Sequence, residues 1–277
     1  MSRPERVDVL IIGGGVIGTA IAYYLSLKKI QVTLLEQGDL ASGSSGSCDG
    51  LVFMQSKKPG IHLQLALESR KRFERLAEDL PVDIEYRKSG GMVVIETDAE
   101  RAAMETFVAR QRESGADVTL LGPDAARDRE PHLSDTIRGA TWSPLDGQVN
   151  PMALTQGFAL GAKRNGAAIL PHTPVKSLEV KGRCIVSVET DNGRFQADTV
   201  VNAAGVYAPS IGRMVGLDIP IKPRRGQILV TGPAPSLISC CMLSATYIAA
   251  KFDPALAQSG GESVSMERTE SGNLLLG

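Results

Sequence analysis

The feature that most constrains this chain is a glycine-rich turn between two apolar segments near its N-terminus. Residues 7–12 are apolar and β-branched, which predicts a buried parallel strand. A GxGxxG pattern follows directly, and its glycines are Gly13, Gly15 and Gly18. An apolar helix is expected to continue to Lys28, and residues 30–35 predict a second strand that ends at Glu36, 18 residues after Gly18. This order of elements predicts an α/β fold that begins with a dinucleotide-binding unit.

Each part of this unit has a physical role in holding a dinucleotide. Gly13 allows the tight turn, Gly15 lets backbone N–H groups approach a pyrophosphate, and Gly18 lets the helix pack on the strand. The N-terminus of the helix presents unpaired N–H groups and partial positive charge to the phosphates. Glu36 is placed to accept hydrogen bonds from the ribose hydroxyls, and its charge disfavours a 2′-phosphorylated ribose. The alternative is a glycine-rich turn in an α/β protein that binds no nucleotide.

Residues 41–50 form a serine- and glycine-rich segment directly after the second strand. Composition alone would make it a flexible linker, but ligands of open α/β sheets bind at this carboxyl edge. Together with the glycine turn and Glu36, the segment resembles the FAD-dependent amino-acid and amine oxidoreductases. This superfamily, that of D-amino-acid oxidase, includes glycine oxidase, the sarcosine oxidase β subunit and the flavin subunits of opine and hydrogen cyanide synthase enzymes. The resemblance implies FAD as the cofactor, wrapped by this segment.

The resemblance extends to the middle of the chain. Short strands are expected at 178–180, 184–189 and 194–197, with a hairpin turn at 191–193, and a buried strand is expected at 199–205. In the family such a β-meander interrupts the nucleotide domain, the valine corresponding to Val175 contacts the adenine through its backbone, and the strand end at 203–205 faces the cofactor. The resemblance and the motifs together give as FAD-binding residues Gly13, Gly15, Val16, Ile17, Gly18, Glu36, Gln37, Ser42, Ser44, Ser45, Ser47, Cys48, Gly50, Val175, Ala203, Ala204 and Gly205.

The remaining segments predict a second domain. Residues 61–80 predict an amphipathic helix whose apolar stripe includes Ile61 and Leu65, and residues 97–100 form a capping box that opens a helix to about Glu113. Nucleotide-binding signatures occur before and after 81–141 but not within it. We therefore expect an FAD-binding domain at 1–80 and 142–215 and a substrate domain at 81–141 and 216–277. The first holds a Rossmann-like parallel sheet of the glutathione-reductase type with a β-meander, and the second is α+β with a mixed or antiparallel sheet.

The C-terminal part offers few candidates for substrate binding. Residues 223–230 resemble the family's Pro-x-x-Gly-Gln strand, where Arg224 and Arg225 are either surface charge or near the flavin or an anionic substrate. By motif order Tyr247 corresponds to a tyrosine that faces substrate in glycine-oxidase-like members. Family members normally continue beyond this point with a carboxylate-binding arginine and a second glycine-rich segment. The chain is therefore expected to be a truncated or shortened form.

The resemblance implies oxidation of the C–N bond of an amino acid or secondary amine. Hydride would pass from the substrate α-carbon to FAD, leaving an imine that water hydrolyses. Re-oxidation by oxygen would make the protein an oxidase, and re-oxidation by a quinone or a partner subunit would make it a dehydrogenase. Two alternatives stay open: an FAD-binding subunit or inactive remnant that depends on partner chains, and an NAD-dependent dehydrogenase.

Composition excludes several other classes. A formal charge of −1 and 43% hydrophobic residues argue against a disordered chain and against a basic nucleic-acid-binding protein. Four cysteines without CxxC spacing and three isolated histidines predict neither a disulfide scaffold nor a metal site. The uncharged run 9–27 imitates a signal or membrane segment, but the glycine triplet 13–15 interrupts it. We expect no transmembrane segment and a cytoplasmic location, peripheral to the inner membrane if the protein is a quinone-linked dehydrogenase.

Overall fold

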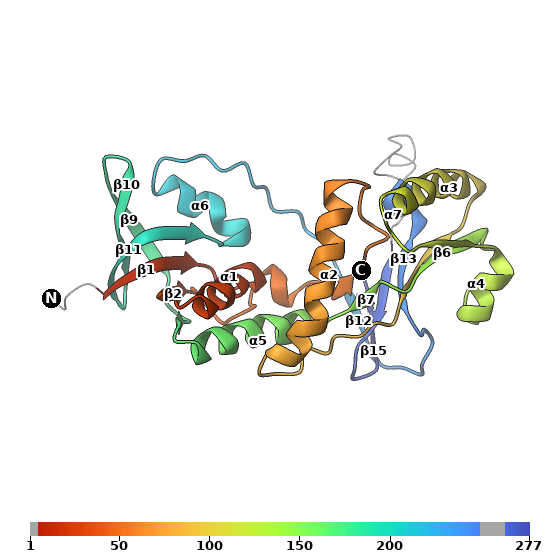
Figure 1. Cartoon of the computed structure of the whole chain (residues 1–277), viewed down its shortest axis with the longest axis horizontal. Helices are drawn as coiled ribbons and strands as arrows, with labels where there is room; N and C mark the ends of the chain where they lie inside the picture. Colours follow the sequence, from red (N-terminus) through yellow and green to blue (C-terminus); the bar gives the residue numbers. More distant parts are fainter. Residues whose placement is uncertain (1–4, 250–263) are drawn as a thin grey trace. The chain divides into compact units, whose positions relative to one another are not determined.

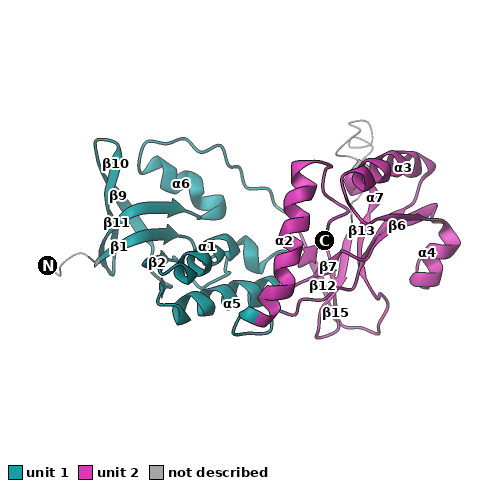
Figure 2. Cartoon of the chain, in the orientation of Figure 1, with its two compact units in different colours: residues 1–48, 79–84, 151–225 teal, residues 49–78, 85–150, 226–277 magenta. Residues whose placement is uncertain are grey.

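The fold consists of two compact units, each assembled from several stretches of the chain (Figures 1 and 2). A computed structural model describes residues 5–249 and 264–277. Unit 1 comprises residues 1–48, 79–84 and 151–225, and unit 2 comprises residues 49–78, 85–150 and 226–277.

Unit 1 is built on a six-stranded sheet of order β8-β2-β1-β11-β10-β9. Its strands are β1 (Glu5–Ile12), β2 (Val32–Leu35), β8 (Ala168–Leu170), β9 (Val175–Lys181), β10 (Cys184–Thr190) and β11 (Gly193–Asn202). The first four in spatial order pair in parallel, whereas β11, β10 and β9 form an antiparallel meander. Its helices are α1 (Val16–Leu27), η1 (Ser44–Gly46), α5 (Pro151–Arg164), η2 (Gly205–Tyr207) and α6 (Ala208–Arg213).

The last strand of the meander is longer than the sequence predicts. We expected separate strands at 194–197 and 199–205, but β11 runs without a break from Gly193 to Asn202. Residues 193–195 pair antiparallel with β10, and residues 195–202 pair in parallel with β1. One strand therefore belongs to both parts of the sheet. Its residues are mostly half-buried, so the expectation of a buried strand at 199–205 is wrong.

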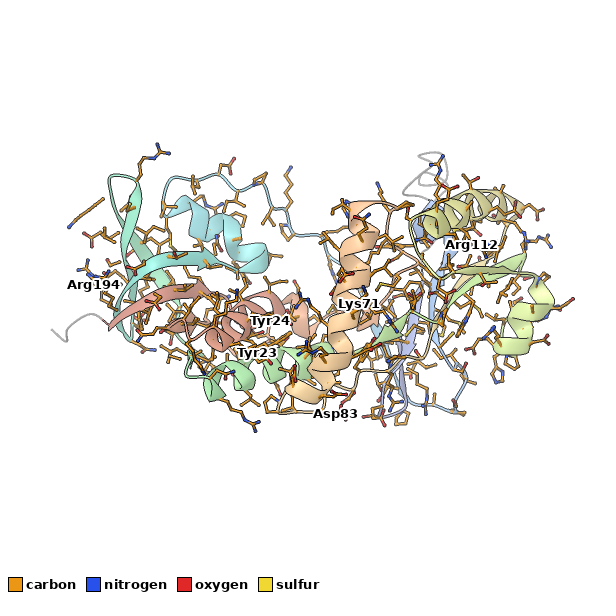
Figure 3. All side chains as sticks on the ribbon, in the orientation of Figure 1. Tyr23, Tyr24, Lys71, Asp83, Arg112 and Arg194 are labelled. Carbon is orange, nitrogen blue, oxygen red and sulfur yellow. The ribbon has the colours of Figure 1, made fainter. Side chains whose placement is uncertain are left out.

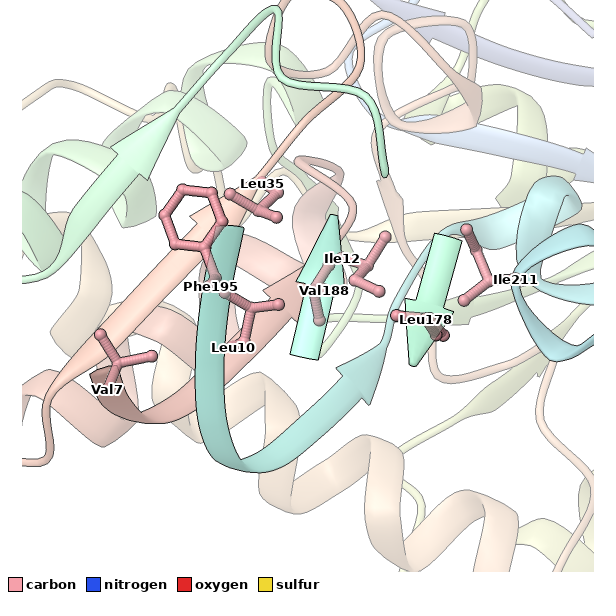
Figure 4. Packing of buried hydrophobic residues seen from close by; sticks show 8 residues of the cluster. All are labelled: Val7, Leu10, Ile12, Leu35, Leu178, Val188, Phe195 and Ile211. Atoms are coloured by element: carbon pink, nitrogen blue, oxygen red, sulfur yellow. The ribbon is translucent and has the colours of Figure 1, made fainter. Parts of the chain in front are cut away.

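A hydrophobic core joins the parallel strands to the meander (Figure 4). Its fully buried members come from five strands and from α6, and they are Val7, Leu10, Ile12, Leu35, Leu178, Val188, Phe195 and Ile211. The predicted apolar strands near the N-terminus thus have the buried positions that their composition indicates.

Helix α5 packs against α1 through a small residue facing aromatic rings. A Cβ atom on Gly161 would lie 2.8 Å from the Tyr23 ring, so the two helices approach closely at this position. Tyr23 and Tyr24 lie next to one another on α1, with ring centroids 5.2 Å apart (Figure 3). The ring of Phe158 on α5 lies 5.6 Å from that of Tyr23.

Unit 2 contains a seven-stranded mixed sheet of order β12-β15-β14-β13-β4-β6-β5. Its strands are β4 (Gly91–Ile95), β5 (Thr119–Leu121), β6 (Gly139–Ser143), β12 (Leu229–Pro233), β13 (Cys241–Ser244), β14 (Ser265–Arg268) and β15 (Asn273–Leu276). Only β13 and β4 pair in parallel. A separate two-stranded ladder joins β3 (Leu51–Val52) to β7 (Gly147–Gln148). The helices of unit 2 are α2 (Ile61–Asp79, in unit 2 through Glu78), α3 (Asp98–Glu113), α4 (Pro123–Arg129) and α7 (Ala245–Ala249). The parallel sheet with a meander in unit 1 and the mixed sheet in unit 2 confirm the predicted fold class.

Two local predictions for unit 2 have opposite outcomes. The capping box is confirmed, because Thr97 Oγ1 accepts the Glu100 N–H and the Glu100 carboxylate accepts the Thr97 N–H. The apolar stripe of α2 is partly wrong: Ile61 and Leu65 are 62% and 65% exposed, whereas Leu63 is buried. At about 100° per residue, Leu63 lies nearly opposite Leu65 on the helix. The buried face of the first turn of α2 is therefore the face that carries Leu63, and not the expected face that carries Leu65.

The bounds of the compact units differ from the expected domain bounds. Residues 49–78 and 142–150, expected with the FAD domain, belong to unit 2, because β6 extends to Ser143 and pairs with β4, and because Gln55 Nε2 donates to the Gly91 carbonyl. Residues 81–84 and 216–225, expected with the substrate domain, belong to unit 1. For 81–84 the reason is packing, since Val82 and Ile84 lie against α5 at Gly157. The expected strand at 223–230 is also displaced, because β12 begins only at Leu229.

Candidate cofactor site

A cavity of about 520 Å³ lies in unit 1 at the carboxyl ends of β1, β2 and β11. Its volume is in the range of known ligand pockets. Fourteen of the seventeen predicted FAD-binding residues line it: Gly13, Gly15, Val16, Ile17, Glu36, Gln37, Ser42, Ser44, Ser45, Cys48, Val175, Ala203, Ala204 and Gly205. The tertiary structure thus brings together residues from four segments that are far apart in the sequence.

The glycine turn between β1 and α1 has no space for side chains at two positions. Gly13 has a φ of +119°, and a Cβ atom there would lie 2.4 Å from the Ala203 carbonyl oxygen. A Cβ atom on Gly18 would lie 1.9 Å from the Gly13 carbonyl oxygen. Gly18 does not line the cavity. Its position is instead one of close contact between the helix and the turn, as the motif predicts.

The N-terminus of α1 opens into the cavity. Gly15 is the N-cap residue and offers no side chain to the first turn of the helix. The Val16 N–H instead donates to Ser45 Oγ at 2.9 Å, so a serine of the segment 42–48 satisfies a donor that the helix itself leaves unpaired. A Cβ atom on Gly15 would come within 3.1 Å of the same Oγ. An anion in the cavity would thus meet both a helix N-terminus and serine hydroxyls.

Glu36 presents its carboxylate on another wall of the cavity. Its Oε2 accepts the Gly14 N–H at 2.6 Å and its Oε1 accepts the Gly38 N–H at 2.8 Å. These two backbone donors fix the orientation of the carboxylate. Because a carboxylate has about four acceptor positions, it retains capacity for two further donors, as vicinal hydroxyls require.

Three predicted residues lie outside the cavity. They are Gly18, Ser47 and Gly50. Gly50 belongs to unit 2, where its N–H donates to the Glu267 carboxylate, and its contact with FAD stays a prediction.

The structure also adds cavity residues that the sequence analysis missed: Ile12, Leu35, Gly43, Thr173, Val206, Tyr207 and Ile211. Gly43 lies between predicted residues, and Val206 and Tyr207 directly follow Gly205, so a wider window around each motif would have included them. Thr173 lies two residues before Val175, so the same wider window would have included it, and its backbone N–H donates to the Glu36 carbonyl at 2.7 Å.

Tyr247, the predicted substrate contact, lies on α7 in unit 2 and is 42% exposed. It does not line the cavity. Its contact with substrate stays a prediction.

Comparison of the sequence with known protein families identifies the family of the chain. The family model "DAO: FAD dependent oxidoreductase" matches residues 8–277. The chain belongs to this family. FAD, and not NAD, is therefore its cofactor, and the chain is of the oxidoreductase class that the resemblance implies.

Among relatives of this DAO family, dimethylglycine dehydrogenase of Rattus norvegicus is 31% identical over 84% of the chain, which spans only 27% of that protein. Hydrogen cyanide synthase subunit HcnC of Pseudomonas protegens is 31% identical over 90% of the chain and 70% of its own length. The crystal structure of glycine oxidase from Geobacillus kaustophilus superimposes with a TM-score of 0.86 at 28% identity, covering 99% of this chain and 71% of that one.

The DAO-family cofactor fits the residues of the cavity. A side-chain-free position at Gly15, an open helix N-terminus, serine hydroxyls and an oriented carboxylate match the pyrophosphate and the ribose of FAD in chemical type. Within 5–249 and 264–277, no cluster of His, Cys, Asp or Glu could hold a metal ion. No helix among the same residues is long and apolar enough to cross a membrane.

Proposed function

We propose that the cavity of unit 1 binds FAD, with the pyrophosphate at the N-terminus of α1 and the adenosine ribose on Glu36. The absence of a side chain at Gly15 and the serine hydroxyl of Ser45 beside the N-terminus of α1 support the first contact, and the oriented Glu36 carboxylate supports the second. Val175 and the residues 203–205 line the same cavity and would complete the site. Gly18 would act by packing the helix on the turn.

We further propose that the protein oxidises the C–N bond of an amino acid or secondary amine. When bound, FAD supplies the two-electron acceptor for the C–H bond next to nitrogen. The residues of the chain bind the cofactor and orient it, and Tyr247 is the candidate contact for substrate. The observation that carries this proposal is the cavity itself, whose glycine turn, carboxylate and serine segment lie in a chain that matches the family model over residues 8–277.

Flavin absorbance tests this proposal directly. The protein, loaded with FAD and freed of excess by gel filtration, should show the flavin spectrum. Anaerobic mixing with a panel of D-, L- and N-alkyl amino acids should then bleach the absorbance with at least one of them. Retained FAD that no amine bleaches would contradict the proposed reaction, and no retained FAD would contradict the proposed site.

A second candidate is a flavoprotein subunit that acts only with partner chains. It is favoured by the similarity to HcnC, which is named as a subunit of hydrogen cyanide synthase. This candidate predicts bound FAD that amines bleach only after partner chains are added. A cytoplasmic location accompanies both candidates as a proposal.

A further inference from the structure

The connection between β8 and β9, residues 171–174, forms part of the wall of the cavity in unit 1. The two strands lie at opposite ends of the strand order, and only this short connection joins them. Thr173 in the connection and Val175 at the start of β9 both line the cavity, and Thr173 is buried. The path of the connection therefore decides where part of the cavity wall lies.

One side of the connection is hydrogen-bonded to the backbone around Glu36. The Thr173 N–H donates to the Glu36 carbonyl at 2.7 Å, and the His172 N–H donates to the Gly38 carbonyl at 3.2 Å. The Glu36 N–H donates to the Leu170 carbonyl at 3.0 Å. These bonds continue the pairing of β2 with β8 beyond the ends of both strands. The connection is thus held beside the residue whose carboxylate faces the cavity.

The other side of the connection is hydrogen-bonded to the meander through one side chain. Asn192 lies in the turn between β10 and β11, and its Nδ2 donates to Thr173 Oγ1 at 2.9 Å. The same Nδ2 donates to the His172 carbonyl at 3.4 Å. Thr173 Oγ1 donates its own hydrogen to the Pro171 carbonyl at 3.0 Å. Asn192 does not line the cavity, so it holds the connection from outside.

A wall segment that is held from both sides is ordered before a ligand arrives. Binding then does not have to restrict its conformations, and the affinity is higher for that reason. Without the Asn192 side chain, the backbone bonds to the Glu36 segment would remain, but the side that faces the meander would lose its hydrogen bonds. Part of the ordering would then accompany binding and weaken it.

We propose that Asn192 is a positioning residue for the adenosine end of FAD: through its hydrogen bond to Thr173 it holds the connection 171–174 beside Glu36. This inference rests on the proposed FAD site, in which Glu36 receives the adenosine ribose. The sequence indicates only a hairpin turn at Asn192.

Alanine at position 192 removes the side chain without straining the turn. Asn192 is exposed and does not have a positive φ, whereas Gly193 beside it has a φ of +135°. The N–H of residue 192 keeps its acceptor, Thr190 Oγ1, at 3.1 Å. Asn192→Ala should therefore fold, and its effect on binding can be measured.

The test measures the dissociation constant of FAD by flavin fluorescence titration and that of ADP by its displacement of FAD. ADP carries the adenosine and the diphosphate of FAD but not the flavin. Asn192→Ala should bind FAD about threefold to tenfold more weakly than the wild type, the range that loss of one ordinary hydrogen bond gives. ADP should lose affinity by the same factor, because the proposed effect is confined to the adenosine end.

Substitution of Thr173 tests the hydrogen bond itself. Thr173→Val has nearly the same shape but no hydroxyl, so it should weaken the binding of both ligands at least as much as Asn192→Ala does. The double variant Asn192→Ala/Thr173→Val should bind little more weakly than Thr173→Val, because the bond between the two side chains can be lost only once. Losses that multiply would overturn the proposal, since the two residues would then act independently.

Asn165 provides the matched control. It is another asparagine of unit 1 whose Nδ2 donates to a backbone carbonyl, that of Gly161 on α5, at 2.9 Å. It does not line the cavity. Asn165→Ala should leave both dissociation constants unchanged, and a loss as large as that in Asn192→Ala would overturn the specific role of Asn192.

Hydrogen exchange of the His172 and Thr173 amides in the protein without FAD tests how firmly the connection is held. Asn192→Ala should raise their exchange, whereas Asn165→Ala should not. Unchanged exchange, unchanged FAD affinity, or weaker FAD binding with unchanged ADP binding overturns the positioning role. If Asn192→Ala does not fold, wild-type affinities in Thr173→Val overturn it. No FAD binding by the wild type, or FAD that ADP does not displace, would instead overturn the proposed site and the positioning role with it.

Discussion

Individual glycines in this protein are required for different physical reasons. The Cβ position of Gly15 points at Ser45 Oγ within the cavity, whereas that of Gly18 overlaps the Gly13 carbonyl and that of Gly50 overlaps the Val149 carbonyl. A side chain at Gly15 would therefore compete with a ligand. A side chain at Gly18 or Gly50 would disturb the fold.

Substitution at the cavity should separate steric from electrostatic contributions to FAD binding. Gly15→Val should abolish FAD retention, because its side chain would occupy the space between the helix N-terminus and Ser45. Glu36→Ala removes acceptors for ribose hydroxyls, whose charge-assisted hydrogen bonds are worth about 1.5–3 kcal/mol each before compensation by water. We expect FAD binding at least threefold weaker in this variant.

Gel filtration of FAD-loaded protein measures both effects, and circular dichroism checks that both variants fold. A folded Gly15→Val variant that keeps FAD as tightly as the wild type would show that the cofactor lies elsewhere.

Gly18→Ala should lower the stability of the fold instead. Its Cβ atom would lie 1.9 Å from a backbone oxygen, so the helix or the turn must shift, at a cost of about 1–3 kcal/mol. Urea unfolding measures the loss. Gly226→Ala is the control, since no atom lies within 4 Å of the Cβ position there. Equal stability of the two variants would refute the close contact at Gly18.

At the scale of elements, α3 shows how a local sequence signal and a tertiary contact act on the same residue. Glu100 completes the capping box by accepting the Thr97 N–H. Its other oxygen accepts the hydroxyl of Thr246 on α7 at 2.6 Å. Glu100 therefore both starts α3 and joins it to α7, and only the first role is visible in the sequence.

Thr97→Ala should destabilise the protein by about 1 kcal/mol, because the Glu100 N–H would lose its acceptor at the helix start. Urea denaturation of the variant measures this. Thr106→Ala, at an exposed position within the same helix, should change stability by far less. A loss at Thr106 as large as that at Thr97 would argue against capping as the cause.

At the scale of the whole molecule, two buried carboxylates dominate the expected pH dependence of stability. Asp146 accepts the Met54 N–H at 2.5 Å and a Gln55 Nε2 hydrogen at 2.7 Å. Burial raises its pKa to about 7, as it does that of Glu267. Both groups bind protons more tightly in the folded state, so the free energy of unfolding should fall as the pH rises from about 4 to about 7.

Asp146→Asn should reduce this pH dependence. Burial raises the pKa of Asp146 from its ordinary value near 4 to about 7, which corresponds to about 4 kcal/mol between the two ends of the range, and the variant cannot ionise at this position. Urea unfolding at several pH values gives the slope of the unfolding free energy against pH. The slopes of the variant and the wild type are compared, and not their absolute stabilities, because the amide of the variant also changes the hydrogen bonds at this position. Asp124→Asn, at an exposed aspartate, should keep the slope of the wild type. A slope unchanged in Asp146→Asn would contradict the raised pKa.

Short motifs and the pattern of apolar residues in the sequence predicted several secondary-structure elements of this protein correctly. The apolar run 7–12, the glycine turn and Glu36 identified β1, α1 and β2 correctly, because backbone geometry at glycines and burial of parallel strands leave direct marks on composition. Thr97 likewise marked the start of α3. The resemblance to a family added Val175 and Ala203–Gly205, which no periodicity in the chain would have joined to the cavity.

The tertiary structure alone decided which distant groups share one environment. Nothing near Gly50 in the sequence indicates that a glutamate 217 residues later accepts its N–H, or that Val149 leaves no room for a side chain there. The continuity of β11 was decided in the same way, since pairing with β1 on one side and β10 on the other overrides local breaks in its pattern. The physical reason is that hydrogen-bond partners and burial depend on contacts between distant segments, whereas turns, caps and periodicity depend on neighbours in the chain.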